Sequence, residues 1–143
     1  MSLVERFPYR DRNPATGGLD LMPDLPILLR NSTVSVTTLG LVDSGASINV
    51  LAHDVGLQLG FVWDQQRTRV VLGGTLAGVD ARGIVVEAVV GQLPAVTLAF
   101  AWAISDQVPC LLGEFNFFLE FEVHFVRAQG FFEIKPSSKV VSP

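Results

Sequence analysis

The stretch Leu41-Val42-Asp43-Ser44-Gly45-Ala46-Ser47 places a carboxylate, a hydroxyl and a glycine between two apolar runs. Asp, Ser and Gly are common turn formers, so an ordinary turn is one interpretation. The other is an active site, because an Asp at the end of a buried strand is costly to desolvate unless donors such as the Ser44 hydroxyl and the Gly45 N–H hold it. Asp-Ser/Thr-Gly arises by chance in roughly one chain in twenty of this length. The rest of the sequence has to decide.

The composition indicates one soluble domain with a core of its own. The chain has 143 residues, of which 49% are hydrophobic and 17% are charged. No apolar run approaches the roughly 18 residues of a membrane-spanning helix, and the start of the chain lacks the apolar segment of a signal peptide. We therefore expect a cytoplasmic protein without a membrane segment. The net charge of −4 comes from scattered acids and there is no basic stripe, which argues against nucleic acid as a partner.

The cysteine and histidine content argues against metal and cofactor chemistry. Cys110, the single cysteine, lies among apolar residues, and we interpret it as a buried, inert thiol. His53 and His124 are far apart and have no other ligand types nearby, so we expect no metal site and no cofactor. No nucleophile-elbow motif supports a Ser-His-Asp triad.

Short alternating runs with polar turns predict a mostly β protein. Residues 1–24, rich in Arg, Asp, Asn, Pro and Gly, are expected to form an N-terminal arm with little core of its own, and residues 137–143 a frayed tail. Between them, strands are expected at residues 26–30, 33–43, 47–51, 65–71, 81–90, 95–104, 122–126 and 130–136. This pattern predicts a closed β-barrel or sandwich in residues 25–136.

Two segments have a helical pattern. Residues 52–61 have room for one or two helical turns. Residues 113–121 are the strongest helix candidate, because Phe115, Phe118 and Leu119 stand at positions i, i+3 and i+4. We expect one short helix near the C-terminus of the domain.

Two further motifs follow the Asp-Ser-Gly stretch. Residues 71–80 (VLGGTLAGVD) form a glycine-rich tip between two expected strands, and glycines there permit positive φ and mobility. Neither a Lys-Ser/Thr pair nor a helix follows these glycines, so phosphate binding is a poor explanation. Residues 110–113 (CLLG) then lead into the expected helix. Taken singly, these two motifs are explained by an ordinary hairpin and by a buried strand before a helix.

In this order, the three motifs resemble the retropepsin-like aspartic proteases. The resemblance runs from about Leu25 to Pro136 and includes the closing hairpin of residues 121–136. It implies a closed barrel of the acid-protease type and an aspartic endopeptidase that needs no cofactor. Residue by residue, it assigns Asp43 as the catalytic aspartate, Ser44 as the hydroxyl that braces the catalytic pair across the subunit boundary, and Gly45 as the residue that lets the loop pass close to the scissile bond.

The same resemblance assigns supporting and substrate-binding roles. Leu111, Leu112 and Gly113 match the segment that supports the catalytic loop. Glu114 departs from the family pattern, which often has Arg there. The residues expected to contact substrate belong to the flap and the catalytic loop, and are Ala46, Leu72, Gly73, Gly74, Thr75 and Leu76. The apolar character of Ala46, Leu72 and Leu76 suggests hydrophobic side chains beside the scissile bond.

A single Asp-Ser-Gly motif implies two chains. Hydrolysis by a carboxylate pair needs two carboxyls that share one proton, and the chain has one such motif, so a second Asp43 is expected from the other chain of a homodimer. In the family, the chain ends pair as a sheet between subunits, and residues 131–136 are the expected contributor. The substrate would be an extended polypeptide. A catalytically inactive dimerisation or peptide-binding module is the alternative, and a protease domain cut from a membrane-attached parent is a third hypothesis.

Overall fold

Alternating apolar residues in the first long hairpin start the sheet. In the computed structural model, which describes residues 3–138, β4 (Asp24–Asn31) and β5 (Val34–Val42) pair antiparallel around a turn at Ser32, whose φ is +56°. The buried side chains of β4 alternate along the strand as Leu25, Ile27 and Leu29, each fully buried. This period of two places one face of the hairpin in the core.

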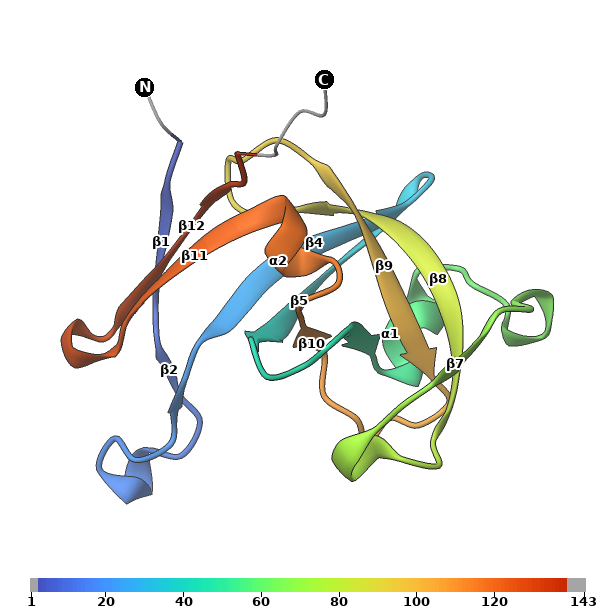
Figure 1. Ribbon diagram of the computed structural model, residues 1–143, viewed down its shortest axis with the longest axis horizontal. Helices are drawn as coiled ribbons and strands as arrows, with labels where there is room; N and C mark the ends of the chain where they lie inside the picture. Colours follow the sequence, from blue (N-terminus) through green and yellow to red (C-terminus); the bar gives the residue numbers. More distant parts are fainter. Residues whose placement is uncertain (1–2, 139–143) are drawn as a thin grey trace.

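The hairpin belongs to a closed barrel (Figure 1). Its strands follow the order β4-β5-β10-β6-β9-β8, and the pairing of β8 with β4 closes the ring. The remaining strands of this sheet are β6 (Asn49–Leu51), β7 (Arg69–Val71), β8 (Asp80–Val89), β9 (Val96–Ala103) and β10 (Leu111–Leu112). Strand β7 extends the sheet beyond β8. The predicted mostly β closed barrel is confirmed. Its core includes the fully buried Phe100 and Trp102 of β9.

The helices differ from the sequence prediction. Helix α1 (His53–Gln58) lies in the segment that had room for one or two turns. Helix α2 (Phe117–Glu120) is shorter than the helix predicted at 113–121, because Glu114 and Phe115 form backbone hydrogen bonds with the loop after β5 and strand β11 starts at Phe121.

The predicted apolar face of that helix is wrong for two of its three residues, while Phe118 is partly buried and packs against the core. Phe115 lies outside the helix and is 56% exposed, and Leu119 is 54% exposed. The side chains that enter the core are instead Phe117 and Phe121, which are also four positions apart, with ring centroids 4.9 Å from each other.

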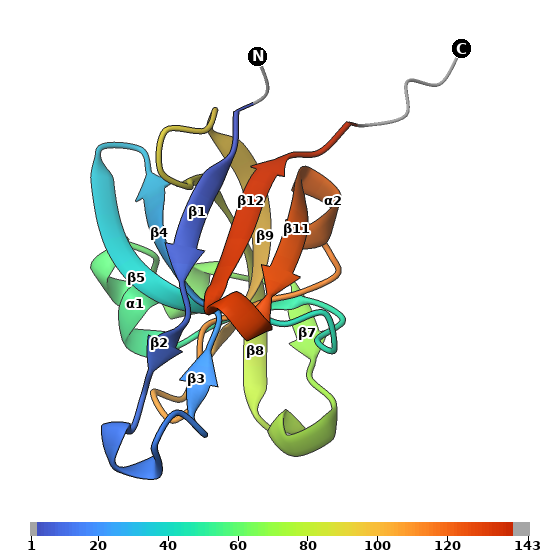
Figure 2. The same cartoon turned by 90° about the vertical axis from the view of Figure 1, so that its left-hand side faces the viewer.

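A second sheet joins the two ends of the chain. Strands β1 (Glu5–Pro8), β12 (Phe131–Pro136) and β11 (Phe121–Val126) lie side by side in that order and are antiparallel (Figure 2). Because β12 is the central strand, both its edges are already paired, which corrects the expectation that residues 131–136 pair with a second subunit. The free edges of this sheet belong to β1 and β11.

Residues 3–24, expected to be part of an arm, pack against the rest of the chain. Phe7 stacks on Phe132 and Tyr9 meets the same ring edge-on, each with centroids 5.7 Å apart. After β1 come the two short strands β2 (Arg10–Asp11) and β3 (Leu21–Met22), which pair with each other. The polar composition of this segment hid the alternation of Phe7 and Tyr9, which places both rings on the core side.

The boundaries of the protease domain at residues 25 and 136 stay a prediction. Of the expected tail, residues 139–143 lie outside the described residues. Within residues 3–138, no helix has the length and apolar character needed to cross a membrane.

Candidate active site

Asp43 follows directly after the last residue of β5, at the opening of a tight turn. Its backbone N–H donates to the Leu112 carbonyl at 3.0 Å, and its own carbonyl accepts from Ala46 N–H at 3.1 Å. The side chain turns back on the loop, where carboxylate Oδ1 accepts the Gly45 N–H at 2.9 Å. The carboxylate is half-buried, and within residues 3–138 its Oδ2 forms no hydrogen bond. One oxygen is therefore fixed and the other is available to a ligand.

Strand β10 and the residues after it hold this loop. Leu111 and Leu112 pair in parallel with Leu41 and Val42. Beyond β10, Glu114 N–H donates to the Ala46 carbonyl at 2.8 Å and Phe115 N–H donates to the Ser47 carbonyl at 3.0 Å.

Gly113 lies against the same loop. A Cβ at this position would lie 2.5 Å from the Ile48 carbonyl oxygen and 2.7 Å from that of Ala46. Glycine is required here because the two backbone segments approach too closely for any side chain.

A buried amide network, which the sequence did not reveal, completes the support. Asn49, fully buried, accepts the Gly113 N–H on its Oδ1 at 2.8 Å and donates from Nδ2 to the Ala99 carbonyl and to Asn116 Oδ1. Asn116 in turn bonds Thr97 and Ala99. An Asn at an apolar position of a short strand was the available signal, since buried polar groups are retained where they are hydrogen-bonded.

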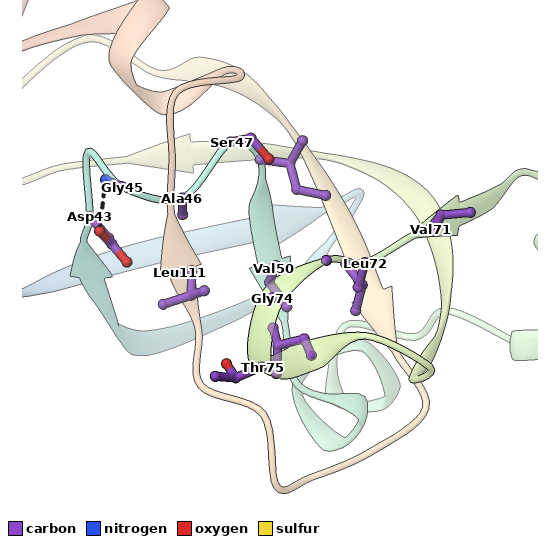
Figure 3. Close-up of a pocket in the computed structure, with 13 residues that line it drawn as sticks. Asp43, Gly45, Ala46, Ser47, Val50, Val71, Leu72, Gly74, Thr75 and Leu111 are labelled. Carbon is purple, nitrogen blue, oxygen red and sulfur yellow. Dashed lines mark hydrogen bonds between the residues drawn. The ribbon is translucent and has the colours of Figure 1, made fainter.

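The hairpin of β7 and β8 borders the cleft at Asp43. A 3-10 turn at Gly74–Leu76 forms part of its tip, and Gly74 has φ +59°. The cleft has a volume of about 320 Å³. Figure 3 shows Asp43, Ala46 and Leu111 along one side, with Leu72, Gly74 and Thr75 of the hairpin tip nearby.

The lining of the cleft contains all six residues predicted to bind substrate, namely Ala46, Leu72, Gly73, Gly74, Thr75 and Leu76. It also contains Ser47, Ile48, Val50, Val71 and Leu111, which were not predicted to contact substrate. Alternation after Ala46 was the signal for Ile48 and Val50, because every second residue of an extended segment points to the same side.

Comparison with solved structures agrees with this architecture. A retropepsin-like aspartic protease from Rickettsia conorii matches over 95% of this chain and 94% of its own, with a TM-score of 0.65 and 18% identity. The chain has the retropepsin-like fold. The EIAV protease complexed with the inhibitor HBY-793 also matches, over 67% of this chain and 85% of its own, with a TM-score of 0.48 and 18% identity. No family model matches the sequence, and no curated protein does.

Within this retropepsin-like fold, the predicted site residues meet at one place, and their roles stay predictions. Asp43, Gly45 and Leu111 line the cleft, while Leu112 and Gly113 are buried behind the loop that follows β5. Ser44 differs from the expectation that its hydroxyl holds the neighbouring carboxylate. It is exposed, and within the described residues its hydroxyl forms no hydrogen bond. The Gly45 N–H alone serves that purpose inside one chain.

The cysteine and the two histidines, Cys110, His53 and His124, lie outside the cleft. Burial raises the pKa of the Cys110 thiol to about 12, in keeping with an inert side chain. The ring of His53 stacks on Trp102 with centroids 5.4 Å apart. His124 lies on β11, in the sheet of β1, β12 and β11 that we call the terminal sheet. Across residues 3–138, no three His, Cys, Asp or Glu side chains gather as metal ligands.

Proposed function

We propose that this protein is an aspartic endopeptidase that cleaves extended polypeptides with a water molecule activated by two Asp43 carboxylates, one from each chain of a homodimer. The position of Asp43 carries the proposal. Its carboxylate lies half-buried in a cleft bordered by a glycine-rich hairpin, with Oδ1 held by the Gly45 N–H. The fold, shared with a solved aspartic protease, supports the same reading.

The chemistry requires two carboxyl groups that share one proton. The ionised carboxylate takes a proton from water, whose oxygen attacks the peptide carbonyl carbon, while the protonated carboxyl gives its proton to the carbonyl oxygen. The resulting diol then collapses. The carboxyl that took its proton from water gives that proton to the amide nitrogen, and the other carboxylate takes a proton from one hydroxyl of the diol. The C–N bond breaks, a carboxylic acid and an amine leave, and the pair is again singly protonated.

A second carboxyl group has to come from outside this chain. Among the described residues that line the cleft, Asp43 is the one titratable side chain. The sequence holds a single Asp-Ser-Gly motif. Two copies related by a two-fold axis would bring the same residue to the site twice, which is the economical way to complete it.

The lining suggests the kind of substrate. Ile48, Val50, Leu72, Leu76 and Leu111 are apolar and carry no charge. Such a surface favours apolar side chains next to the scissile bond, while an extended backbone bonds to the main chain of the loop and hairpin.

The test is cleavage of a peptide library by the wild-type protein and by Asp43→Asn. We expect Asp43→Asn to lower kcat/KM by at least about 100-fold, because it removes the acid–base pair. The matched control is Asp64→Asn, an exposed acid outside the cleft, which should leave cleavage unchanged.

Mixing the two proteins tests the shared site. An excess of Asp43→Asn should capture wild-type chains in inactive mixed dimers and suppress their activity. Activity that stays proportional to the wild-type chains alone would contradict the shared site. A folded dimer that binds peptides without cleaving them would instead support the non-catalytic module.

A further inference from the structure

The buried carboxylate of Asp24 lies at the start of β4, beside the strand that leads to Asp43. Asp24 is 5% exposed, and among the described residues no other acidic side chain is buried. It pairs with Leu41 across the hairpin, and the carbonyl of the preceding Pro23 accepts the Val42 N–H at 3.1 Å. Asp43 is the next residue after Val42, which ends β5. Asp24 thus belongs to the segment whose backbone holds the C-terminal end of β5.

Two arginines of the N-terminal segment bind this carboxylate. Arg12 makes a two-point contact, from Nε to Oδ2 at 2.9 Å and from a terminal nitrogen to Oδ1 at 2.5 Å. Arg10 adds a longer contact to Oδ2 at 3.4 Å. A forked guanidinium–carboxylate contact restricts both position and angle, which a single point charge does not.

The cost of this arrangement indicates a purpose beyond stability. Taking a carboxylate out of water is unfavourable, and a buried ion pair is often no more stabilising than apolar residues of the same size. What such a pair provides is one defined geometry. Here that geometry holds Arg10 and Arg12 on Asp24, next to the strand that ends before Asp43, where a small displacement of Asp43 would lower the rate.

We propose that Arg12, acting through the carboxylate of Asp24, is a positioning residue for Asp43, so that the N-terminal segment is part of the catalytic support. The proposal rests on the proposed protease function for its effect on rate. It follows that removal of residues 9–24 would lower activity.

The test uses a neutral pair, Arg12→Gln with Asp24→Asn, in the full chain. This double variant keeps side chains of similar size and leaves no uncompensated charge. We expect kcat to fall by about 10-fold or more with KM changed by less than about threefold, because positioning acts on the transition state more than on substrate binding. The kcat of Arg12→Lys should lie between that of wild type and that of the neutral pair, since Lys keeps the charge but lacks the forked guanidinium.

The matched control is a second neutral pair on the same strand, Arg30→Gln with Glu87→Gln. This exposed ion pair joins β4 to β8 near the opposite end of β4. The control should keep the wild-type kcat. A wild-type kcat in the Arg12/Asp24 pair, or a loss through KM alone, would overturn the proposal.

Amide hydrogen exchange gives a readout that does not depend on activity. In the neutral Arg12/Asp24 pair the Val42 amide should exchange faster, while the amides of β8 and β9 keep wild-type rates. Faster exchange throughout the chain would indicate general destabilisation and overturn a positioning role. Should wild-type protein cleave nothing, the proposed function fails, and the exchange at Val42 still decides whether Arg12 fixes this strand.

Discussion

At the scale of single residues, the close approach at Gly113 explains why two distant segments meet at the candidate site. The Ala46 carbonyl that a Cβ would meet is already bonded to Glu114 N–H. The Ile48 carbonyl belongs to the same peptide group as Asn49 N–H, which donates to the Phe115 carbonyl at 3.1 Å. Neither carbonyl can move away at low cost, since each shift breaks a hydrogen bond in a buried place.

Gly113→Ala should therefore lower the free energy of unfolding by about 1–3 kcal/mol, the usual cost of overpacking. The rate of peptide cleavage should fall by more than the loss of folded protein explains, because the displaced loop carries Asp43. Chemical denaturation and peptide cleavage measure the two effects.

Gly73→Ala is the matched control for stability, since a Cβ there meets nothing within 4 Å and the backbone φ is −112°. Equal destabilisation by both variants would contradict the role of close approach at Gly113.

Some single residues of the candidate site could be predicted from the sequence and others could not. Asp43, Gly45 and the hairpin glycines, which line the cleft, could be singled out because they stand in short motifs with particular residue types in sequence. Asp24 and Arg12 could not, because neither partner of this ion pair is unusual alone. Asn49 stands at an apolar position, but the sequence does not show that its partner is Gly113.

At the scale of elements, helix α1 docks on the barrel through a glycine. A Cβ on Gly56 would lie within 3.0 Å of three atoms of the Trp102 ring. The same ring donates its Nε1–H to the His53 carbonyl at 3.0 Å, so helix and ring are held on each other.

Gly56→Ala should destabilise the protein by about 1–3 kcal/mol, although Ala is the better helix former by about 1 kcal/mol. Thermal unfolding followed by tryptophan fluorescence measures this. Leu57→Ala, half-exposed on the same helix, is the control and should change stability little. A more stable Gly56→Ala protein would show that propensity outweighs packing at this helix.

Helix α2 shows why the element boundaries were harder to predict than the strands. The run of Phe115, Phe117, Phe118 and Phe121 fits more than one helical face, and only the loop contacts of Glu114 and Phe115 decide where the helix begins. Strands with a clear alternation, such as β4 and β8, lie at nearly the predicted places. Strand β7 begins at Arg69, four residues later than predicted, and β10 lies outside the predicted strand ranges.

At the scale of the whole molecule, the closure of the barrel depends on pairing that local pattern cannot show. Leu28 lies opposite Val89 and Arg30 opposite Glu87, far apart in sequence. The period of two predicts that each strand has a buried face, but it does not say which strand will lie beside it.

The ion pair at Asp24 makes stability depend on acid. Burial by itself raises the pKa of this carboxyl, but the hydrogen bond and charge of Arg12, followed by those of Arg10, lower it by more, so its pKa lies below the ordinary value of 3.8. A lowered pKa in the folded state contributes stability above the unfolded value, and this contribution is lost as pH falls through the folded value.

The stability difference between wild type and Asp24→Asn should therefore be largest well above pH 3.8 and shrink as the pH falls below that value. Denaturation at several pH values measures it. The control is Glu133→Gln. Arg6 and then His124 lower the pKa of Glu133, but this pair is exposed to solvent and should give a much smaller effect. A difference that stays constant with pH would contradict the linkage.

The terminal sheet also determines how the molecule responds to mechanical load. Strands β1 and β12 are antiparallel, with Glu5 opposite Ile134 and Pro8 opposite Phe131, so the outer ends of both strands lie together (Figure 2). A force that separates these ends loads the pair at Glu5 and Ile134 first and opens the ladder one bond at a time, as a zipper opens, instead of shearing all bonds together. The chain would peel at β1 while the barrel and its cleft remain closed.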